Sequence, residues 1–77
     1  MKILKEQYKQ LQDLIEGGTI DLNDFYTVSF GRVDIRIQGD YNAFLVDKYQ
    51  RKFGNKFQIK ENGFAELVID NMTIIFG

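Results

Sequence analysis

The sequence contains no cysteine, histidine, proline or tryptophan. Without cysteine the chain can form no disulfide and offers no thiolate nucleophile, and without histidine it lacks the usual general base and the imidazole metal ligand. The single serine, Ser29, stands in neither an S-x-x-K motif nor a nucleophile elbow. We therefore predict that the protein is not an enzyme, binds no cofactor and has no metal site.

Carboxylate chemistry is the one catalytic or metal-binding alternative that this composition leaves open. Asp34 and Asp40 could act as a pair, and Asp21 and Asp24 lie in a polar segment. However, a chain of 77 residues with eleven acidic side chains contains such pairs by chance. We therefore treat carboxylate chemistry as the weakest hypothesis.

The chain also lacks an excess of charge of one sign. Ten basic and eleven acidic residues give a net charge of −1, which argues against global electrostatic attraction to nucleic acid or to an anionic membrane. No apolar run approaches the roughly 20 residues of a membrane span. Charges interrupt residues 1–18 every few positions, unlike the apolar core of a signal peptide. We predict a cytoplasmic protein that does not bind membranes.

The length of 77 residues predicts one small domain, residues 1–77. Burial of apolar surface would contribute roughly 120 kcal/mol to folding, while ordering the chain would cost about 115 kcal/mol. The two quantities nearly cancel, and no disulfide or metal adds stability. Self-association as a homodimer is therefore an expected source of further stability.

Two amphipathic helices are predicted. Residues 2–16 carry apolar side chains at helical spacing, and Gly17 and Gly18 would end this helix. The apolar stripe of this helix consists of Leu4, Tyr8, Leu11 and Ile15. A polar loop follows, and the second helix would begin at an N-cap, either Asp40 or Asn42, and end at Gly54.

Residues 26–38 predict a β-hairpin. Apolar side chains occupy even positions up to Phe30 and odd positions from Val33, so the alternation changes phase at Gly31 and Arg32. A two-residue turn would explain this change, and a single bulged strand is the alternative. The predicted pairs on one face are Phe30 with Val33, Val28 with Ile35, and Tyr26 with Ile37.

Three further strands are predicted at residues 56–60, 64–70 and 72–76. A three-residue turn with Gly63 left-handed and a two-residue turn at Asp70 and Asn71 would join them. The predicted pairs are Ile59 with Ala65, Gln58 with Glu66, Phe57 with Leu67, Leu67 with Ile74, Ile69 with Met72, and Ala65 with Phe76. The registers of the two turns place the same apolar residues on one face of the sheet. This agreement supports both predicted registers.

The predicted element order is therefore α-β-β-α-β-β-β. We expect a single α+β domain in which two helices cover one face of an antiparallel sheet of about five strands.

The clearest candidate binding surface is the cationic stretch of residues 47–60. Its cations are Lys48, Arg51, Lys52, Lys56 and Lys60. On a helical wheel Phe44, Lys48, Arg51 and Lys52 fall along one flank of the second helix, which suits an acidic protein surface or a phosphate backbone. The alternative is structural: these cations would favour the helix dipole and cover apolar surface.

The sheet face without helices is the second candidate. It would expose Phe64, Val68 and Ile75 among polar side chains, enough to form a partner or dimer surface. Scattered surface hydrophobes are the alternative. If the final strand ended the sheet, its open edge could also pair with another strand.

Together these observations favour a small non-enzymatic protein-interaction module, of adaptor or inhibitor type, that binds a protein partner and can self-associate as a homodimer. Nucleic-acid binding through residues 48–60 is the alternative function.

Overall fold

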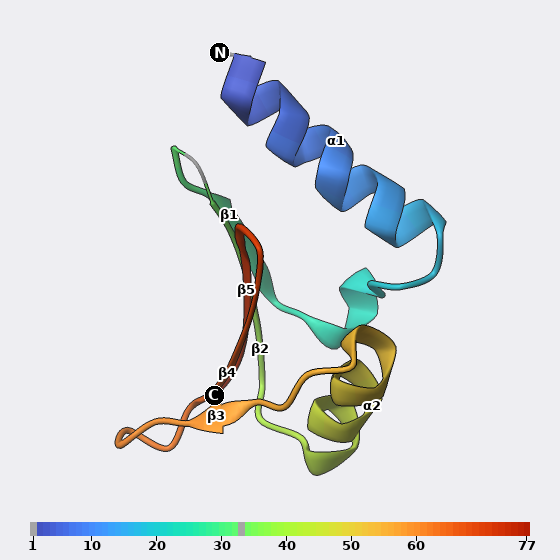
Figure 1. The fold of residues 1–77 in the computed structure, drawn as a ribbon. Coiled ribbons are helices and arrows are strands. Elements are labelled where there is room, and N and C mark those ends of the chain that lie inside the picture. The colour runs from blue at the N-terminus through green and yellow to red at the C-terminus, as the bar shows by residue number, and fades with distance from the viewer. Residues whose placement is uncertain (1, 33) are drawn as a thin grey trace.

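Two helices and five strands follow one another in the predicted order α-β-β-α-β-β-β, and the helices pack on the sheet in an α+β arrangement (Figure 1). The computed structural model describes residues 2–32 and 34–77, with side chains from residue 6 onward. The side chain of Leu4 and the pairing of Val33, both used in the predictions above, lie outside the described residues. The elements are α1 (Lys2–Glu16), the 3-10 helix η1 (Leu22–Asp24), β1 (Thr27–Phe30), β2 (Ile35–Gly39), α2 (Ala43–Phe53), β3 (Gln58–Ile59), β4 (Ala65–Ile69) and β5 (Met72–Phe76).

Both helices end at the predicted glycines. Gly18 adopts a left-handed conformation with φ 78°, and the N–H groups that follow it donate to the carbonyl of Leu14. Asn42, not Asp40, is the N-cap of α2, because its side chain accepts the N–H of Phe44 at 2.8 Å. Gly54 closes the same helix with φ 70°.

The five strands form one sheet in the order β1-β2-β5-β4-β3. The predicted antiparallel sheet of about five strands is confirmed as a mostly antiparallel one, because all neighbouring pairs are antiparallel except the parallel pair of β2 and β5. Parallel pairing requires the chain to cross from one end of the sheet to the other, and α2 lies in that connection. The final strand β5 lies inside the sheet, so the open edges belong to β1 and β3.

The registers of the three C-terminal strands are confirmed. Ile59 lies opposite Ala65, Leu67 opposite Ile74 and Ile69 opposite Met72. Gly63 is left-handed with φ 86°, as predicted for the first turn. The prediction was wrong for the burial of Ile59, whose exposed fraction is 64 %. Ile59 is the last residue of β3, beside the turn that contains Gly63, and the β3–β4 hairpin projects away from both helices in Figure 1.

The predicted register of the first hairpin was wrong by two residues. Phe30 pairs with Ile35 and Val28 with Ile37, and the N–H of Gly31 donates to Asp34 O at 2.8 Å. A Cβ at position 31 would collide with the carboxylate of Asp34, so the loop packs against a glycine. A shift of two residues leaves every side chain on its original face, which is why alternation alone could not distinguish the two registers.

Tyr26 was also predicted wrongly, as a core residue opposite Ile37. Its N–H donates to Gln38 O at 2.9 Å although the direct partner of Gln38 is Thr27. Two residues thus face one, which is the pairing of a β-bulge. The side chain of Tyr26 is 56 % exposed, and its hydroxyl donates to Gly77 O at 3.1 Å.

The core lies between the sheet and the two helices, which occupy the same side of the sheet in Figure 1. Its fully buried large side chains are Ile20, Ile35, Ile37, Tyr49, Met72, Ile74 and Phe76. The chain before β1 crosses the sheet close to Gly39, where a Cβ would collide with Asp24 O and lie 3.2 Å from Phe25 Cα. A glycine is needed at this crossing because two backbones meet there.

No helix in the described part of the chain has both the length and the apolar character needed to cross a membrane.

Candidate interaction surfaces

The predicted cationic flank of α2 is partly used inside the molecule. Lys48 Nζ donates to Asp24 Oδ2 at 2.7 Å, and Lys52 Nζ donates to Gly18 O at 2.6 Å. Both lysines therefore tie α2 to the segment that joins α1 to β1. The Lys52 bond also satisfies a carbonyl at the C-terminal end of α1, where positive charge is favourable.

Phe44 and Arg51 are the more accessible members of this flank. Phe44 lies in the first turn of α2 and is 87 % exposed. Arg51 is exposed as well, and its Nε lies 3.0 Å from Asp47 Oδ2, one helical turn away. The structure thus leaves an isolated aromatic side chain and one cation that is paired at the surface. Binding through Phe44, Lys48, Arg51 and Lys52 stays a prediction.

Asp24 is the centre of a polar cluster beneath the α2 flank. Its Oδ2 accepts hydrogen bonds from Lys48 Nζ and from Tyr49 Oη, both at 2.7 Å. The same tyrosine oxygen accepts the N–H of Asp21 at 3.1 Å. The cluster joins the fully buried Tyr49 to the segment that contains η1, and so it positions α2 on the sheet.

The pKa values of the cluster follow from these bonds. Burial by itself would raise the pKa of Asp24, but the hydrogen bonds from Lys48 and Tyr49 and the nearby lysine charges hold it below its ordinary value. Burial raises the pKa of Tyr49, and the Asp24 carboxylate raises it further. At neutral pH the carboxylate is therefore charged and the phenol is protonated. Among the described residues, no three carboxylates lie close enough to hold a metal ion.

The sheet face without helices carries the predicted Phe64, Val68 and Ile75. Val68 is 64 % exposed, whereas the other two are half-buried. The ring of Phe64 lies against Gly77, where a Cβ would come within 2.6 Å of Phe64 Cγ. The direct partner of Ile75 is Glu66 and that of Val68 is Thr73, so polar side chains separate the apolar ones. This face is mixed in character and has no continuous apolar centre.

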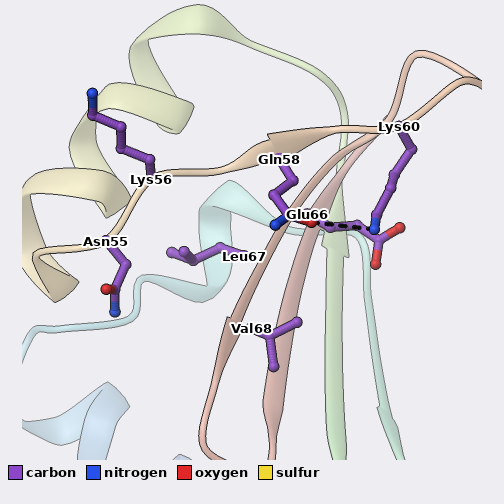
Figure 2. Close-up of a pocket in the computed structure, with 7 residues that line it drawn as sticks. All are labelled: Asn55, Lys56, Gln58, Lys60, Glu66, Leu67 and Val68. Atoms are coloured by element: carbon purple, nitrogen blue, oxygen red, sulfur yellow. Dashed lines mark hydrogen bonds between the residues drawn. The ribbon is translucent and has the colours of Figure 1, made fainter.

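Beside Val68 lies a polar pocket of about 220 Å³ (Figure 2). Its lining residues are Asn55, Lys56, Gln58, Lys60, Glu66, Leu67 and Val68. Lys60 Nζ donates to Gln58 Oε1 at 3.4 Å, and Figure 2 shows the Lys56 side chain extending away from both. The pocket brings two cations of the predicted 48–60 run close to the open sheet face, but it holds a carboxylate as well.

A third surface was not predicted from the sequence. It is a groove of about 360 Å³ between α1 and β1, which we call the α1–β1 groove. Its lining residues are Tyr8, Leu11, Gln12, Ile15, Glu16, Leu22, Val28 and Phe30. Tyr8 is 62 % exposed, and the centroid of its ring lies 5.7 Å from that of Phe30. The groove is thus an apolar surface beside the β1 edge of the sheet.

Within the predicted apolar stripe of the first helix, Leu11 is buried in the core. Tyr8 was part of the same predicted stripe, yet it lines the groove. Leu22, an exposed leucine within an otherwise polar segment, is the one sequence signal that could have indicated the groove.

Comparisons with protein-family models, with curated proteins and with solved structures found no match to this chain.

Proposed function

We propose that this protein is a small non-enzymatic protein-interaction module, of adaptor or inhibitor type. The observation that supports this function is the α1–β1 groove beside the open edge of β1. An edge strand offers backbone donors and acceptors, and the groove offers apolar surface. A polypeptide strand complements both at once, because it supplies backbone hydrogen bonds together with apolar side chains at alternate positions.

The exposure of the groove residues also favours a binding role. Tyr8 and Leu22 are large apolar side chains that remain exposed at one site in a chain of 77 residues. Contiguous exposed apolar surface on a small protein commonly marks an interaction site. A cytoplasmic location remains the prediction made from the sequence.

Nucleic-acid binding through residues 48–60 is the second candidate. Arg51, Lys56 and Lys60 support it, because they lie in two neighbouring surface pockets at the end of α2 and along β3. Lys48 and Lys52 support it less, since each donates to an internal oxygen. Neutralisation of about three phosphates would give a log-log salt slope near −3. Weak binding that keeps its affinity after Lys56→Glu and Lys60→Glu would exclude this candidate.

Selection from a displayed library of random peptides of about 12 residues tests the proposed function. The chain would be immobilised at low density, and a Tyr8→Asp, Leu22→Asp variant, which changes two exposed residues of the groove, would serve for counter-selection. We expect enriched peptides with apolar residues at alternate positions and dissociation constants on the order of 10 µM. An absence of enriched sequences, together with a strictly monomeric chain, would refute the function.

A further inference from the structure

The β1 edge has a defined hydrogen-bonding phase. Gly31 N–H bonds Asp34 O, and in an antiparallel ladder hydrogen-bonded pairs alternate with pairs that are not bonded. Thr27 and Ser29 therefore direct their N–H and C=O groups at β2. Val28 and Phe30 direct theirs away from β2, toward the open edge. The side chains of these same two residues line the α1–β1 groove.

The position of α1 leaves the groove open above this edge. On one side of α1, Gln7 Nε2 donates to Asp34 O at 3.2 Å and Gln10 Nε2 donates to Asn71 Oδ1 at 3.0 Å. These bonds attach the helix over the ends of β2 and β5. The opposite side of the helix lines the groove with three side chains at successive helical turns: Tyr8, Gln12 and Glu16. Helix α1 therefore forms one wall of the groove above β1 and leaves the side at the β1 edge open.

We propose that the α1–β1 groove and the β1 edge bind a second copy of this chain, through antiparallel pairing of the two β1 strands. This inference rests on the proposed function and names its partner. With Ser29 on the two-fold axis, Val28 pairs with Phe30 of the second copy, and the reverse pair follows by symmetry. Each pair exchanges two backbone hydrogen bonds, so the interface between the two β1 strands contains about four backbone hydrogen bonds.

The same symmetry fills the groove. An enclosed cavity of about 150 Å³ holds one benzene molecule, so the observed volume of about 360 Å³ accommodates two apolar side chains of that size. Val28 and Phe30 of the second copy supply two such side chains, on the face of the joined sheet that lies beneath the two α1 helices. Ile15 and Leu22 are then covered as well.

The charged side chains at the two ends of the groove favour a second copy of this chain as the partner over an unrelated peptide. Glu16 lines the end near η1, and among the described residues no cation forms an ion pair with it. At the other end, Lys9 adjoins Tyr8 and Arg32 follows Phe30 by two residues, and both side chains are exposed. Glu6 lies three residues before Lys9, and Asp34 in the same loop as Arg32 pairs with Arg36, so the cations at this end are in excess. Antiparallel pairing places Glu16 of one copy against Lys9 and Arg32 of the other. The interface is therefore complementary to itself.

Multi-angle light scattering after size exclusion tests this proposal. We expect the mass to rise from 9.0 kDa toward twice that value as the concentration increases from about 10 µM to about 1 mM. Val28→Pro removes the N–H that points to the second copy and leaves the ladder to β2 intact, so it should weaken dimerisation at least about tenfold. Val28→Thr keeps the N–H and is the matched control.

A charge exchange provides an independent test if the proline variant does not fold. Glu16→Lys should weaken the dimer about tenfold at low salt, and the double variant Lys9→Glu, Glu16→Lys should restore it. Slower amide hydrogen exchange at Val28 and Phe30 on dimerisation, with little change at Val68, would locate the interface.

Three results would overturn the proposal. The first is a mass that stays at 9.0 kDa up to about 1 mM. The second is a dimer that none of these substitutions changes, which would place the interface on another face. The third is a monomer whose groove binds library peptides, in which case the proposed function stands and the second copy is the wrong partner.

Discussion

The two helices cover the same face of the sheet in different ways. At the α2 end, Tyr49 is fully buried, Asp24 joins the helix to the preceding segment, and Phe76 lies at the centre of an aromatic cluster. At the α1 end, two glutamine side chains attach the helix along one side, and an apolar groove stays open along the other. The two ends therefore differ in how completely they are packed: α2 closes the core, whereas α1 leaves open the apolar groove that we propose as a binding surface.

Replacing a large side chain by alanine at the centre of the α2 end should have the largest effect on the free energy of unfolding. Phe76 is fully buried, and its ring lies 5.3 Å from that of Phe25, 5.6 Å from that of Phe57 and 6.0 Å from that of Tyr49. Phe76→Ala should lower the free energy of unfolding by about 3–5 kcal/mol, enough to leave little folded protein. Urea denaturation followed by circular dichroism measures this. A loss below about 1 kcal/mol would contradict the view that the α2 end holds the fold together.

Loss of the Asp24 carboxylate should have a smaller effect on the same end. Asp24→Ala removes the acceptor of Lys48 Nζ and Tyr49 Oη, and should lower the free energy of unfolding by about 1–3 kcal/mol. Asp47→Ala is the matched control, because its ion pair with Arg51 is exposed and contributes about 0.5 kcal/mol or less. Equal effects of the two substitutions would show that the partly buried cluster adds no more stability than a surface pair.

The same carboxylate predicts a dependence on pH. The pKa of Asp24 is lower in the folded chain than its ordinary value of 3.8, so ionisation of this group stabilises the folded state. That contribution is complete above the ordinary value and is lost as the pH falls below 3.8 through the folded pKa. The difference in unfolding free energy between the original chain and Asp24→Ala should therefore be largest near neutral pH and shrink in acid. Denaturation series at several pH values measure it, and a difference that grows in acid would refute it.

The smallest effect on stability is expected at the α1 end. Tyr8 is mostly exposed, so Tyr8→Ala should change the free energy of unfolding of the monomer by about 0.5 kcal/mol or less. The same substitution should weaken self-association, because Tyr8 lines the groove. Urea denaturation and light scattering on this one variant measure the unfolding free energy and the self-association separately. A large loss of stability at low protein concentration would show that the groove belongs to the core.

The C-terminal strands were predictable because two independent signals agreed there. Alternation of apolar residues and the turn residues Gly63 and Asp70 specify the same registers, and both turn residues have positive φ in the structure. In the first hairpin, the alternation of apolar residues was almost the only signal for the register. A shift of two residues around Gly31 leaves that alternation unchanged, so it could not identify the register. The parallel neighbours β2 and β5 are far apart in the sequence, so no local pattern could reveal their contact.

The candidate sites were less predictable than the fold, because partners distant in the sequence decide what a side chain does. The helical wheel places Lys48 on the surface of α2, yet it cannot show that Lys48 donates a hydrogen bond to Asp24, which lies 24 residues earlier in the chain. In the same way, the spacing of Tyr8 indicates an apolar helix face, but only the lateral position of α1 over the sheet determines whether that face is core or groove.

The central place of β5 has a consequence for the order of folding. Ribosomes release this strand after every other part of the sheet, yet it must enter between β2 and β4. Until it does, the nascent chain holds two unconnected hairpins whose facing edges have no partner, and the isoleucines of β2 stay in contact with water. Cooperative collapse is therefore delayed until β5 has left the ribosome, and a chain that stops before Met72 should be captured by chaperones or proteases.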